Sequence, residues 1–572
     1  MFIRLAIILI SFTLLFSQGR NIDKKKKKEI VFSNNQSTED YLNMLKKSLD
    51  LLKTNYVDSI NESEIILSGI KGLLNPLDPY TKLLMEESKE SYDILKTGKY
   101  GGIGVQIGLR RDTLTVLSIY EDSPAYSEGL SVGDNIMMID STDTEGLPLK
   151  ESSALIKGEL DSVVTLHVYR SSTKERIKFE LARSNIKIEH VPYWGINKDD
   201  IGYIRITRFS KNSGKDFKAA LKNLKEQGLK SLIIDLRSNS GGLLSSAISI
   251  LDNLTERGDT LLIQKGKTNK TNRVWISRRS PIINADIPIA ILINKKSASA
   301  SEIVAGTIQD LDRGVVIGQK SFGKGLVQHL YDLNDTTTLK ITTAKFYLPS
   351  GRIIQKQDYL NNGFLTDGLD KKDSIFVTRK GRLVEGGGGV NPDLETDFNK
   401  YTSFVNALWK DKVFLTFASD YAPKNLWLRK KIEKDSIIPN RVIQAFKKFV
   451  NEYNLVFNLS GEIELNKIKK KISNNPISIS KYSHNVSITS NNYLLSEIDK
   501  YFQKIKNLQF SLPDNQTQIK NGLLREFCRV FFDEKKRIEV SLINDIEYNA
   551  AVLLFSEKFQ KYNSILEISK ND

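Results

Sequence analysis

Three short apolar runs constrain the fold of this chain most strongly. They read "SLIIDL", "IPIAILIN" and "RGVVIG" and lie at residues 231–236, 287–294 and 313–318, with helical stretches between them. A strand that is covered on both faces does not need to alternate apolar with polar side chains, so continuous runs of this kind are typical of buried strands in an α/β sheet. The sequence therefore predicts an α/β core after residue 200.

The regions on either side of this core carry different patterns. Segments such as "DTLTVLSIY" and "RIKFELAR" alternate apolar and polar residues, which predicts a small β-rich module over residues 98–183. Leucines recur at spacings of three and four from Leu42 to Leu52, which predicts a helical region over residues 37–97. Helical patterns return from about residue 400 to the end, without a recognisable catalytic motif.

The chain begins with a segment typical of exported proteins. Arg4 precedes an apolar or hydroxyl-bearing run at residues 5–16, which has the length of a signal-peptide core and is short for a membrane span. Because the cleavage pattern around Ser17 is poor, both a cleaved signal peptide and an uncleaved anchor fit residues 1–18. The lysines at residues 24–28 then belong to a basic tether.

Composition argues against several function classes. The net charge is +16, but the 84 basic residues are spread along the chain among 68 acidic ones, so no nucleic-acid partner is predicted. The four histidines lack metal-ligand spacing, and no metal or other cofactor is predicted. Cys528 is the only cysteine, and we expect it to be a small buried apolar residue.

The first buried run ends in "DLRSNSGG", which makes Ser240 a candidate nucleophile. A trypsin-like serine needs a histidine and an aspartate from a preceding β-barrel domain, and the sequence before Ser240 does not predict such a domain. Gly241 and Gly242 instead lie between a strand and a helix, where free N–H groups favour a developing negative charge. We therefore expect these two glycines to contribute to an oxyanion hole.

The second buried run leads into "KKSASASEIVAG", again a strand, a small-residue turn and a helix. This arrangement can expose a serine hydroxyl at a sheet edge, and Ser297, Ser299 and Ser301 are all candidates. The alternative is that these serines cap the helix, with Glu302 completing a capping box to Ser299.

A candidate general base follows in "SFGKGLVQ". Lys324 lies between two glycines, which would let the backbone pack closely and bury the ammonium group. Burial lowers the pKa of a lysine, so the neutral amine could take a proton from a serine without a histidine. Gln328 lies on the same face of an extended segment, where its amide could orient the lysine.

Together these segments resemble the carboxyl-terminal processing peptidases, also called tail-specific proteases. The resemblance rests on "DLRSNSGGLL", "KSASASEIVAG", "SFGKGLVQ" and "ITTAKFYLPSGRIIQ", and with "NYVD" and "LDPYTKLL" it covers about residues 40–395. It implies a Ser/Lys dyad whose members stand 25 residues apart, and counting back from Lys324 selects Ser299. In this reading Ser299 is the nucleophile, Lys324 the general base and Gln328 the residue that orients the lysine.

The resemblance also assigns supporting positions. The oxyanion hole corresponds to Gly241, Gly242 and the N–H of Ala300. Asp310 matches an acidic position of some members, for which a supporting role and a plain surface aspartate fit equally well. Ser240 stands where many members have proline, so its hydroxyl is not required for the chemistry.

The β-rich module resembles a PDZ domain. Its carboxylate-binding loop corresponds to "YGGIGVQIG", and "SPAYSEGLSVGDNIMMID" matches a further PDZ stretch. The resemblance implies that the N–H groups of Gly102, Ile103 and Gly104 hold the C-terminal carboxylate of a peptide, which adds a strand at the edge of the module.

The expected fold is an α/β protease core with a mixed sheet, a β-rich PDZ domain, and helical N- and C-terminal regions. The expected parts are a signal peptide or anchor (1–18), a tether (19–36), an N-terminal helical region (37–97), a PDZ domain (98–183), a serine protease core (184–399) and a mainly helical C-terminal region (400–572). The expected function is a periplasmic serine endopeptidase that recognises protein or peptide C-termini. The alternative is a non-catalytic PDZ scaffold with a degenerate protease core, and both a homo-oligomer and an adaptor protein stay open.

Overall fold

The computed structural model describes residues 37–85, 87–356, 375–396, 401–474, 489–556 and 559–567. The expected signal segment and basic tether lie outside these ranges. Among the described residues, no helix combines the length and the apolar character that crossing a membrane requires. The chain divides into two units, Met1–Leu73 and Leu74–Asp572.

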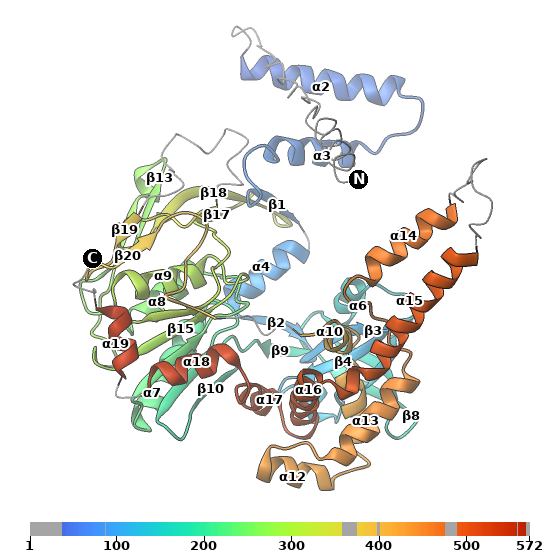
Figure 1. The fold of residues 1–572 in the computed structure, drawn as a ribbon. Helices are drawn as coiled ribbons and strands as arrows, with labels where there is room; N and C mark the ends of the chain where they lie inside the picture. The colour runs from blue at the N-terminus through green and yellow to red at the C-terminus, as the bar shows by residue number, and fades with distance from the viewer. Residues whose placement is uncertain are drawn as a thin grey trace, which may run out of the picture. The chain divides into compact units, whose positions relative to one another are not determined.

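The described part of the first unit is helical, as expected. It contains α2 (Thr38–Asn55) and most of α3 (Glu62–Leu74), and α2 starts at a capping box between Ser37 and Asp40 (Figure 1). The helical prediction fails further on, because β1 (Lys82–Met85) precedes α4 (Glu87–Thr97). Pro76 and Pro79 disfavour a continuous helix here, and β1 pairs with a strand about 250 residues later in the chain.

The protease core of the second unit is built on a six-stranded sheet in the order β10-β11-β12-β15-β16-β21. Its strands are β10 (Tyr193–Ile196), β11 (Ile201–Arg205), β12 (Ser231–Asp235), β15 (Ile289–Ile293), β16 (Val315–Gly318) and β21 (Leu394–Glu395). The strands from β11 to β21 run parallel and β10 is antiparallel to β11, so the sheet is mixed as predicted. The three apolar runs form β12, β15 and β16, and every residue of these strands is buried.

Helices cover both faces of this sheet, which explains why its central strands do not alternate. On one face lie α7 (Ser213–Glu226), α8 (Leu244–Leu251) and α9 (Ala300–Asp310), which pack on residues such as Leu232 and Ile291. On the other face, α18 (Ile546–Leu554) and α19 (Gln560–Leu566) pack on residues such as Ile233 and Leu292. The last described helices therefore complete the protease core (Figure 1).

A second sheet carries the segment around Lys324. Its order is β1-β18-β13-β14, with β17 also paired to β18. The new strands are β13 (Thr260–Gly266), β14 (Arg273–Ile276), β17 (Leu326–Asp332) and β18 (Thr337–Tyr347). A short 3-10 helix, η1 (Asn269–Thr271), follows β13, and the separate pair β19 (Ile375–Val377) and β20 (Leu383–Glu385) follows β18 in the chain.

The predicted PDZ module forms its own sheet, in the order β3-β4-β5-β7-β8. Its elements are β3 (Val105–Arg110), β4 (Thr113–Ile119), α5 (Pro124–Ser127), β5 (Asn135–Ile139), β6 (Thr142–Asp143), α6 (Leu149–Ile156), β7 (Val163–Arg170) and β8 (Glu175–Ala182). A separate two-stranded pair, β2 (Lys99–Gly102) with β9 (Ser184–Lys187), joins the two ends of the module.

The remaining C-terminal helices form a bundle with an aromatic core. They are α10 (Ser403–Lys410), α11 (Val413–Tyr421), α12 (Trp427–Asp435), α13 (Asn440–Glu452), α14 (Glu462–Asn474), α15 (Thr489–Leu508), η3 (Gln509–Ser511), α16 (Pro513–Phe531) and α17 (Glu534–Ser541). Phe414, Phe446 and Phe527 lie at its centre. Cys528 is fully buried beside them, as predicted, and burial raises the pKa of its thiol to about 12.

Candidate active site

Ser299 lies in the turn between β15 and α9, at the N-cap position of the helix. Its backbone adopts φ +56° and ψ −112°, a region that residues with a side chain rarely occupy. A strained turn between a buried strand and a helix is the arrangement that presents a nucleophilic hydroxyl at a sheet edge. Among Ser240, Ser297, Ser299 and Ser301, only Ser299 has a positive φ.

The hydroxyls of the two neighbouring candidate serines are occupied. Ser297 Oγ donates to the carbonyl of Leu236 at 2.9 Å, and Ser301 Oγ donates to the carbonyl of Asn239 at 2.8 Å. Both serines are fully buried, and these bonds fasten the serine turn to the turn that follows β12. The Ser299 hydroxyl, in contrast, donates no hydrogen bond to any described residue.

Glu302 joins the serine turn, residues 294–299 between β15 and α9, to the lysine loop, residues 319–325 between β16 and β17. Its Oε2 accepts the N–H groups of Ser299 at 2.6 Å and Lys324 at 2.9 Å, and its Oε1 accepts the N–H of Gly323 at 2.6 Å and the hydroxyl of Ser321 at 2.5 Å. The carboxyl group is fully buried, and burial raises its pKa although these four hydrogen bonds oppose the rise. The sequence predicted only the contact between Glu302 and Ser299 and missed the link to Lys324.

The glycines beside Lys324 allow close backbone packing, as predicted. A Cβ atom on Gly323 would lie 2.6 Å from Lys356 Cγ, and one on Gly325 would lie 3.0 Å from the backbone nitrogen of Gln355. Burial and, after it, the charge of Lys340 lower the pKa of Lys324 to about 8, against the opposing effects of Glu302 and Asp78. The amine is therefore partly neutral near physiological pH.

The segment before β1 supplies a neighbour of Lys324 that the sequence did not predict. The ring of Tyr80 lies 4.6 Å from Lys324 Nζ. Asp78 shapes this segment, because its carboxylate accepts the N–H groups of Tyr80 at 2.7 Å and Thr81 at 2.8 Å. Both residues come from the motif "LDPYTKLL". This motif formed part of the resemblance to the family, but the sequence predicted no role for its residues.

Gln328 lies on β17, and its amide is directed to the neighbouring strand. Gln328 Nε2 donates to Thr342 Oγ1 at 3.4 Å, and Thr342 Oγ1 donates to Asp78 Oδ1 at 3.2 Å. No hydrogen bond joins Gln328 to Lys324 in the described residues. Its role in orienting the lysine stays a prediction.

Residues 238–242, which we call the oxyanion turn after their predicted role, lie against Ser299. A Cβ on Gly241 would lie 2.9 Å from Ser299 Cβ, and one on Gly242 would lie 2.1 Å from the carbonyl oxygen of Phe209, so both positions need glycine. The Gly241 N–H donates to Asn239 Oδ1 at 2.9 Å. The N–H groups of Gly242 and Ala300 donate to no described residue.

Ser240 and Asp310 form no hydrogen bond with Ser299 or Lys324 among the described residues. Ser240 is exposed, and none of the described histidines forms a hydrogen bond with it. Asp310 is the last residue of α9, at the opposite end of the helix from Ser299. It forms a fully buried ion pair with Arg352 at 2.7 Å, so the alternative of a plain surface aspartate is wrong. Because Arg352 lies after β18, this ion pair fastens that segment to α9.

The predicted carboxylate-binding loop of the PDZ module has backbone N–H groups without described acceptors, and it precedes the edge strand β3. The N–H groups of Ile103 and Gly104 donate to no described residue, whereas Gly102 pairs with Ser184 in the β2–β9 ladder. Gly104 has φ +80°, and a Cβ there would lie 2.1 Å from the Cβ of Ser123. In the sheet of the module β3 is an edge strand, so a further strand can be added beside it.

Comparison with known proteins covers most of the chain. Residues 200–363 match the model of peptidase family S41, residues 101–181 that of the PDZ domain, and residues 404–555 a model described as probable PDZ-protease, C-terminal helical domain. A carboxy-terminal-processing protease of Bartonella bacilliformis is 34% identical over 331 residues, which are 57% of this chain and 75% of that protein. A carboxyl-terminal-processing protease of Synechocystis sp. is 34% identical over 316 residues, 54% of this chain and 72% of that protein.

Proposed function

Because the chain belongs to peptidase family S41, as a carboxy-terminal processing protease with a PDZ domain, we propose that this serine-type peptidase cuts peptide bonds with a Ser299–Lys324 dyad. The observation that carries the proposal is the Glu302 carboxylate, one oxygen of which accepts the backbone N–H groups of both residues. Segments 25 residues apart in the chain are thereby held together at a strained serine turn.

Lys324 acts as the general base in this mechanism. At pH 7.5 a lysine with a pKa of about 8 is neutral in about a quarter of the molecules, compared with about one in a thousand for an unperturbed lysine. The neutral amine takes the hydroxyl proton as Ser299 Oγ attacks the carbonyl carbon of the substrate. The ammonium group then returns this proton to the leaving amine as the C–N bond breaks.

The acyl-enzyme that results is an ester on Ser299. A water molecule gives a proton to the same lysine and attacks the ester carbonyl, which releases the new C-terminus and restores both side chains. In both steps negative charge develops on the carbonyl oxygen. The free N–H groups of Gly242 and Ala300 are the donors best suited to stabilise it, since the Gly241 N–H is already bonded to Asn239.

Substrate recognition is assigned to the PDZ domain. The free N–H groups of Ile103 and Gly104 would bind the C-terminal carboxylate of a protein or peptide, while the chain leading to it pairs with the edge strand β3. Tail binding of this kind would select substrates by an accessible C-terminus.

Export completes the proposal. Arg4 and the apolar run at residues 5–16 support secretion to the periplasm, with or without cleavage near Ser17. Both lie outside the described residues. Fractionation of cells that express the full chain, with detection of its N-terminus, tests this part.

The rival function, a non-catalytic PDZ scaffold with a degenerate protease core, is not favoured because Ser299 and Lys324 are both present. The two functions are separated by incubating the purified protein with unstructured polypeptides and mapping the products by mass spectrometry. The proposal expects new termini with the wild-type protein and none with Ser299→Ala. Binding of C-terminal peptides without any cleavage by the wild-type protein would instead support the scaffold.

A further inference from the structure

We propose that the C-terminal helices position the oxyanion turn, through a contact of Asp545 and Glu547 with Arg237. This inference rests on the proposed function, in which the oxyanion turn stabilises the transition state. It gives the last part of the chain a role in catalysis, as a source of positioning residues that do not touch the substrate.

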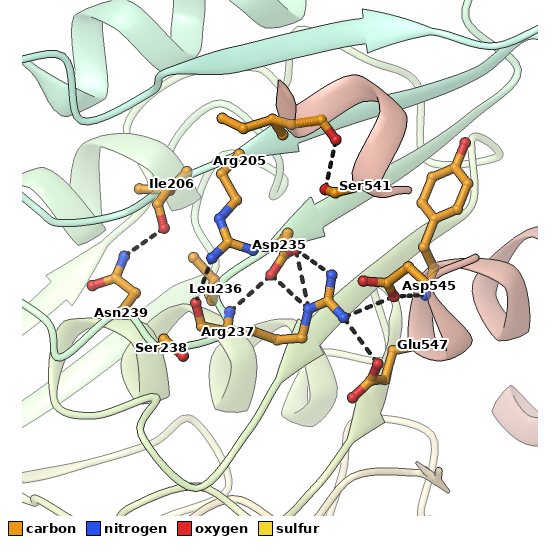
Figure 2. A network of polar contacts seen from close by, with 12 residues as sticks. Arg205, Ile206, Asp235, Leu236, Arg237, Ser238, Asn239, Ser541, Asp545 and Glu547 are labelled. Atoms are coloured by element: carbon orange, nitrogen blue, oxygen red, sulfur yellow. Dashed lines mark hydrogen bonds and ion pairs between the residues drawn. The ribbon is translucent and has the colours of Figure 1, made fainter. Parts of the chain in front are cut away.

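The contact joins α18 to the residue that precedes the oxyanion turn. Arg237 Nη1 donates to Asp545 Oδ1 at 2.8 Å and to Glu547 Oε2 at 2.9 Å (Figure 2). Asp545 is also the N-cap of α18, where its carboxylate accepts the N–H of Tyr548 at 2.8 Å. The two carboxylates therefore lie at the start of the helix that covers one face of the protease sheet.

On its other side the Arg237 guanidinium binds Asp235, the last residue of β12. Arg237 Nη2 lies 2.6 Å from Asp235 Oδ2, and the same oxygen accepts hydrogen bonds from Arg205 at 2.5 Å and the Tyr203 hydroxyl at 2.7 Å. Asp235 is fully buried, which would raise its pKa, but Arg205 and Arg237 hold it well below its usual range. Figure 2 shows Arg237 between this carboxylate and those of α18.

The oxyanion turn starts directly after Arg237 and is also held by other contacts, among them the Ser301 hydroxyl on the Asn239 carbonyl and the Phe209 N–H on the Gly241 carbonyl. Arg205 Nη2 donates to the Arg237 carbonyl at 3.0 Å, and the Ser238 N–H donates to Asn294 Oδ1 at 2.9 Å. The Asn239 amide holds the Ile206 carbonyl at 2.9 Å and accepts the Gly241 N–H. Because Arg237 directly precedes this segment, a shift of its backbone is expected to strain these contacts and to displace Gly241 and Gly242.

Charge balance explains why the α18 carboxylates matter. With them, Arg237 has three carboxylate partners. Without them, its remaining carboxylate partner is Asp235, which also pairs with Arg205. Arg237, Asp545 and Glu547 also line a cleft of about 1540 Å³, so water can replace a lost carboxylate without opening the core. Loss of the contact is expected to loosen the turn rather than unfold the protein.

The test uses Asp545→Asn, Glu547→Gln and the double variant in the full-length protein. Asparagine is a good N-cap and glutamine keeps the shape of glutamate, so both substitutions remove charge with little change to the helix. The matched control is Glu534→Gln on α17, a carboxylate that pairs with Arg537 and Arg529 but does not touch Arg237. Peptide cleavage gives kcat and KM, and thermal unfolding gives Tm.

We expect kcat of the double variant to fall by about tenfold or more while KM stays within about twofold, because an oxyanion hole acts in the transition state. Its Tm should fall no more than that of Glu534→Gln, whose kcat should stay near that of the wild type. The inference is overturned if the wild type cleaves and the double variant keeps its kcat, or if Glu534→Gln loses as much. A wild type that does not cleave, or an active Ser299→Ala, would contradict the proposed function instead. If the double variant does not fold, the two single variants decide by the same criteria.

Discussion

The backbone N–H groups of Ser299 and Lys324 donate to one and the same oxygen atom, Oε2 of Glu302, at 2.6 and 2.9 Å. The serine turn and the lysine loop are therefore held by a buried carboxylate that belongs to neither of them. Because Glu302 lies in the first turn of α9, the helix whose N-cap is Ser299, its position follows that of Ser299. This arrangement makes the geometry of the proposed dyad depend on a residue outside it.

Glu302→Gln is expected to lower kcat by about a hundredfold. All four groups that Glu302 binds are donors, so the NH2 of glutamine would face two of them and leave them unsatisfied, at a cost of about 1–3 kcal/mol for each buried group. Ser321→Ala is the matched control, since it removes one donor and leaves the amides of Ser299 and Lys324 bound. Steady-state kinetics and thermal unfolding of both variants check this, and equal kcat values for Glu302→Gln and the wild type would contradict it.

The activity should rise with pH and reach half its maximum near pH 8. The base must be neutral, and the pKa of Lys324 is lowered to about 8 by burial, so activity is lost as pH falls below that value. At pH 6 about 1% of the lysine is neutral. The profile of kcat/KM between pH 6 and 9.5 measures this, and a flat profile would argue against a lysine base. Lys324→Arg should be inactive, because guanidinium does not act as a base near neutral pH.

Lys340→Gln should move this profile to higher pH. After burial, the positive charge of Lys340 is the largest cause that lowers the pKa of Lys324. Removing this charge therefore raises the pKa of Lys324 and reduces activity at pH 7. Lys198→Gln, which removes the charge of an exposed lysine, is the control and should leave the midpoint unchanged. A midpoint that moves to lower pH in Lys340→Gln would show that the two charges are not coupled in this way.

Peptides with a free C-terminus should bind the protein more tightly than their amides. Two N–H groups, those of Ile103 and Gly104, lack described partners, and hydrogen bonds to a charged group contribute about 1.5–3 kcal/mol. Titration calorimetry with one peptide in both forms, on the Ser299→Ala variant to prevent cleavage, should give a tenfold or larger difference in Kd. Equal affinities would remove the carboxylate from the recognition mechanism.

The sequence predicted the parts of the fold that local patterns determine. The apolar runs became β12, β15 and β16, and the small-residue turn placed Ser299 between a strand and α9. It did not predict β1, because that strand exists through pairing with β18, or the approach of Tyr80 to Lys324, which joins segments 244 residues apart. Continuous apolar strands implied a cover on both faces, but no local signal identified α18 and α19 as one of the two covers.

The same limit applies to the site. The resemblance to the family, which implies a spacing of 25 residues to Lys324, selected Ser299. The bonds that occupy Ser297 and Ser301 could not be read from the sequence, because their acceptors Leu236 and Asn239 lie about 60 residues earlier. Glu302 was visible as a capping residue only. Its second role depends on where the lysine loop lies in space.

The central claim is that Ser299 is the nucleophile, and cleavage by single serine variants tests it most directly. One unstructured substrate is incubated with wild type, Ser299→Ala, Ser297→Ala, Ser301→Ala and Ser240→Ala, and the new termini are quantified by mass spectrometry. The account predicts no cleavage by Ser299→Ala and near wild-type cleavage by Ser240→Ala. It predicts substantial activity for Ser297→Ala and Ser301→Ala, whose buried hydroxyls fasten the turn. Cleavage by Ser299→Ala, together with its loss in Ser240→Ala, would contradict the account.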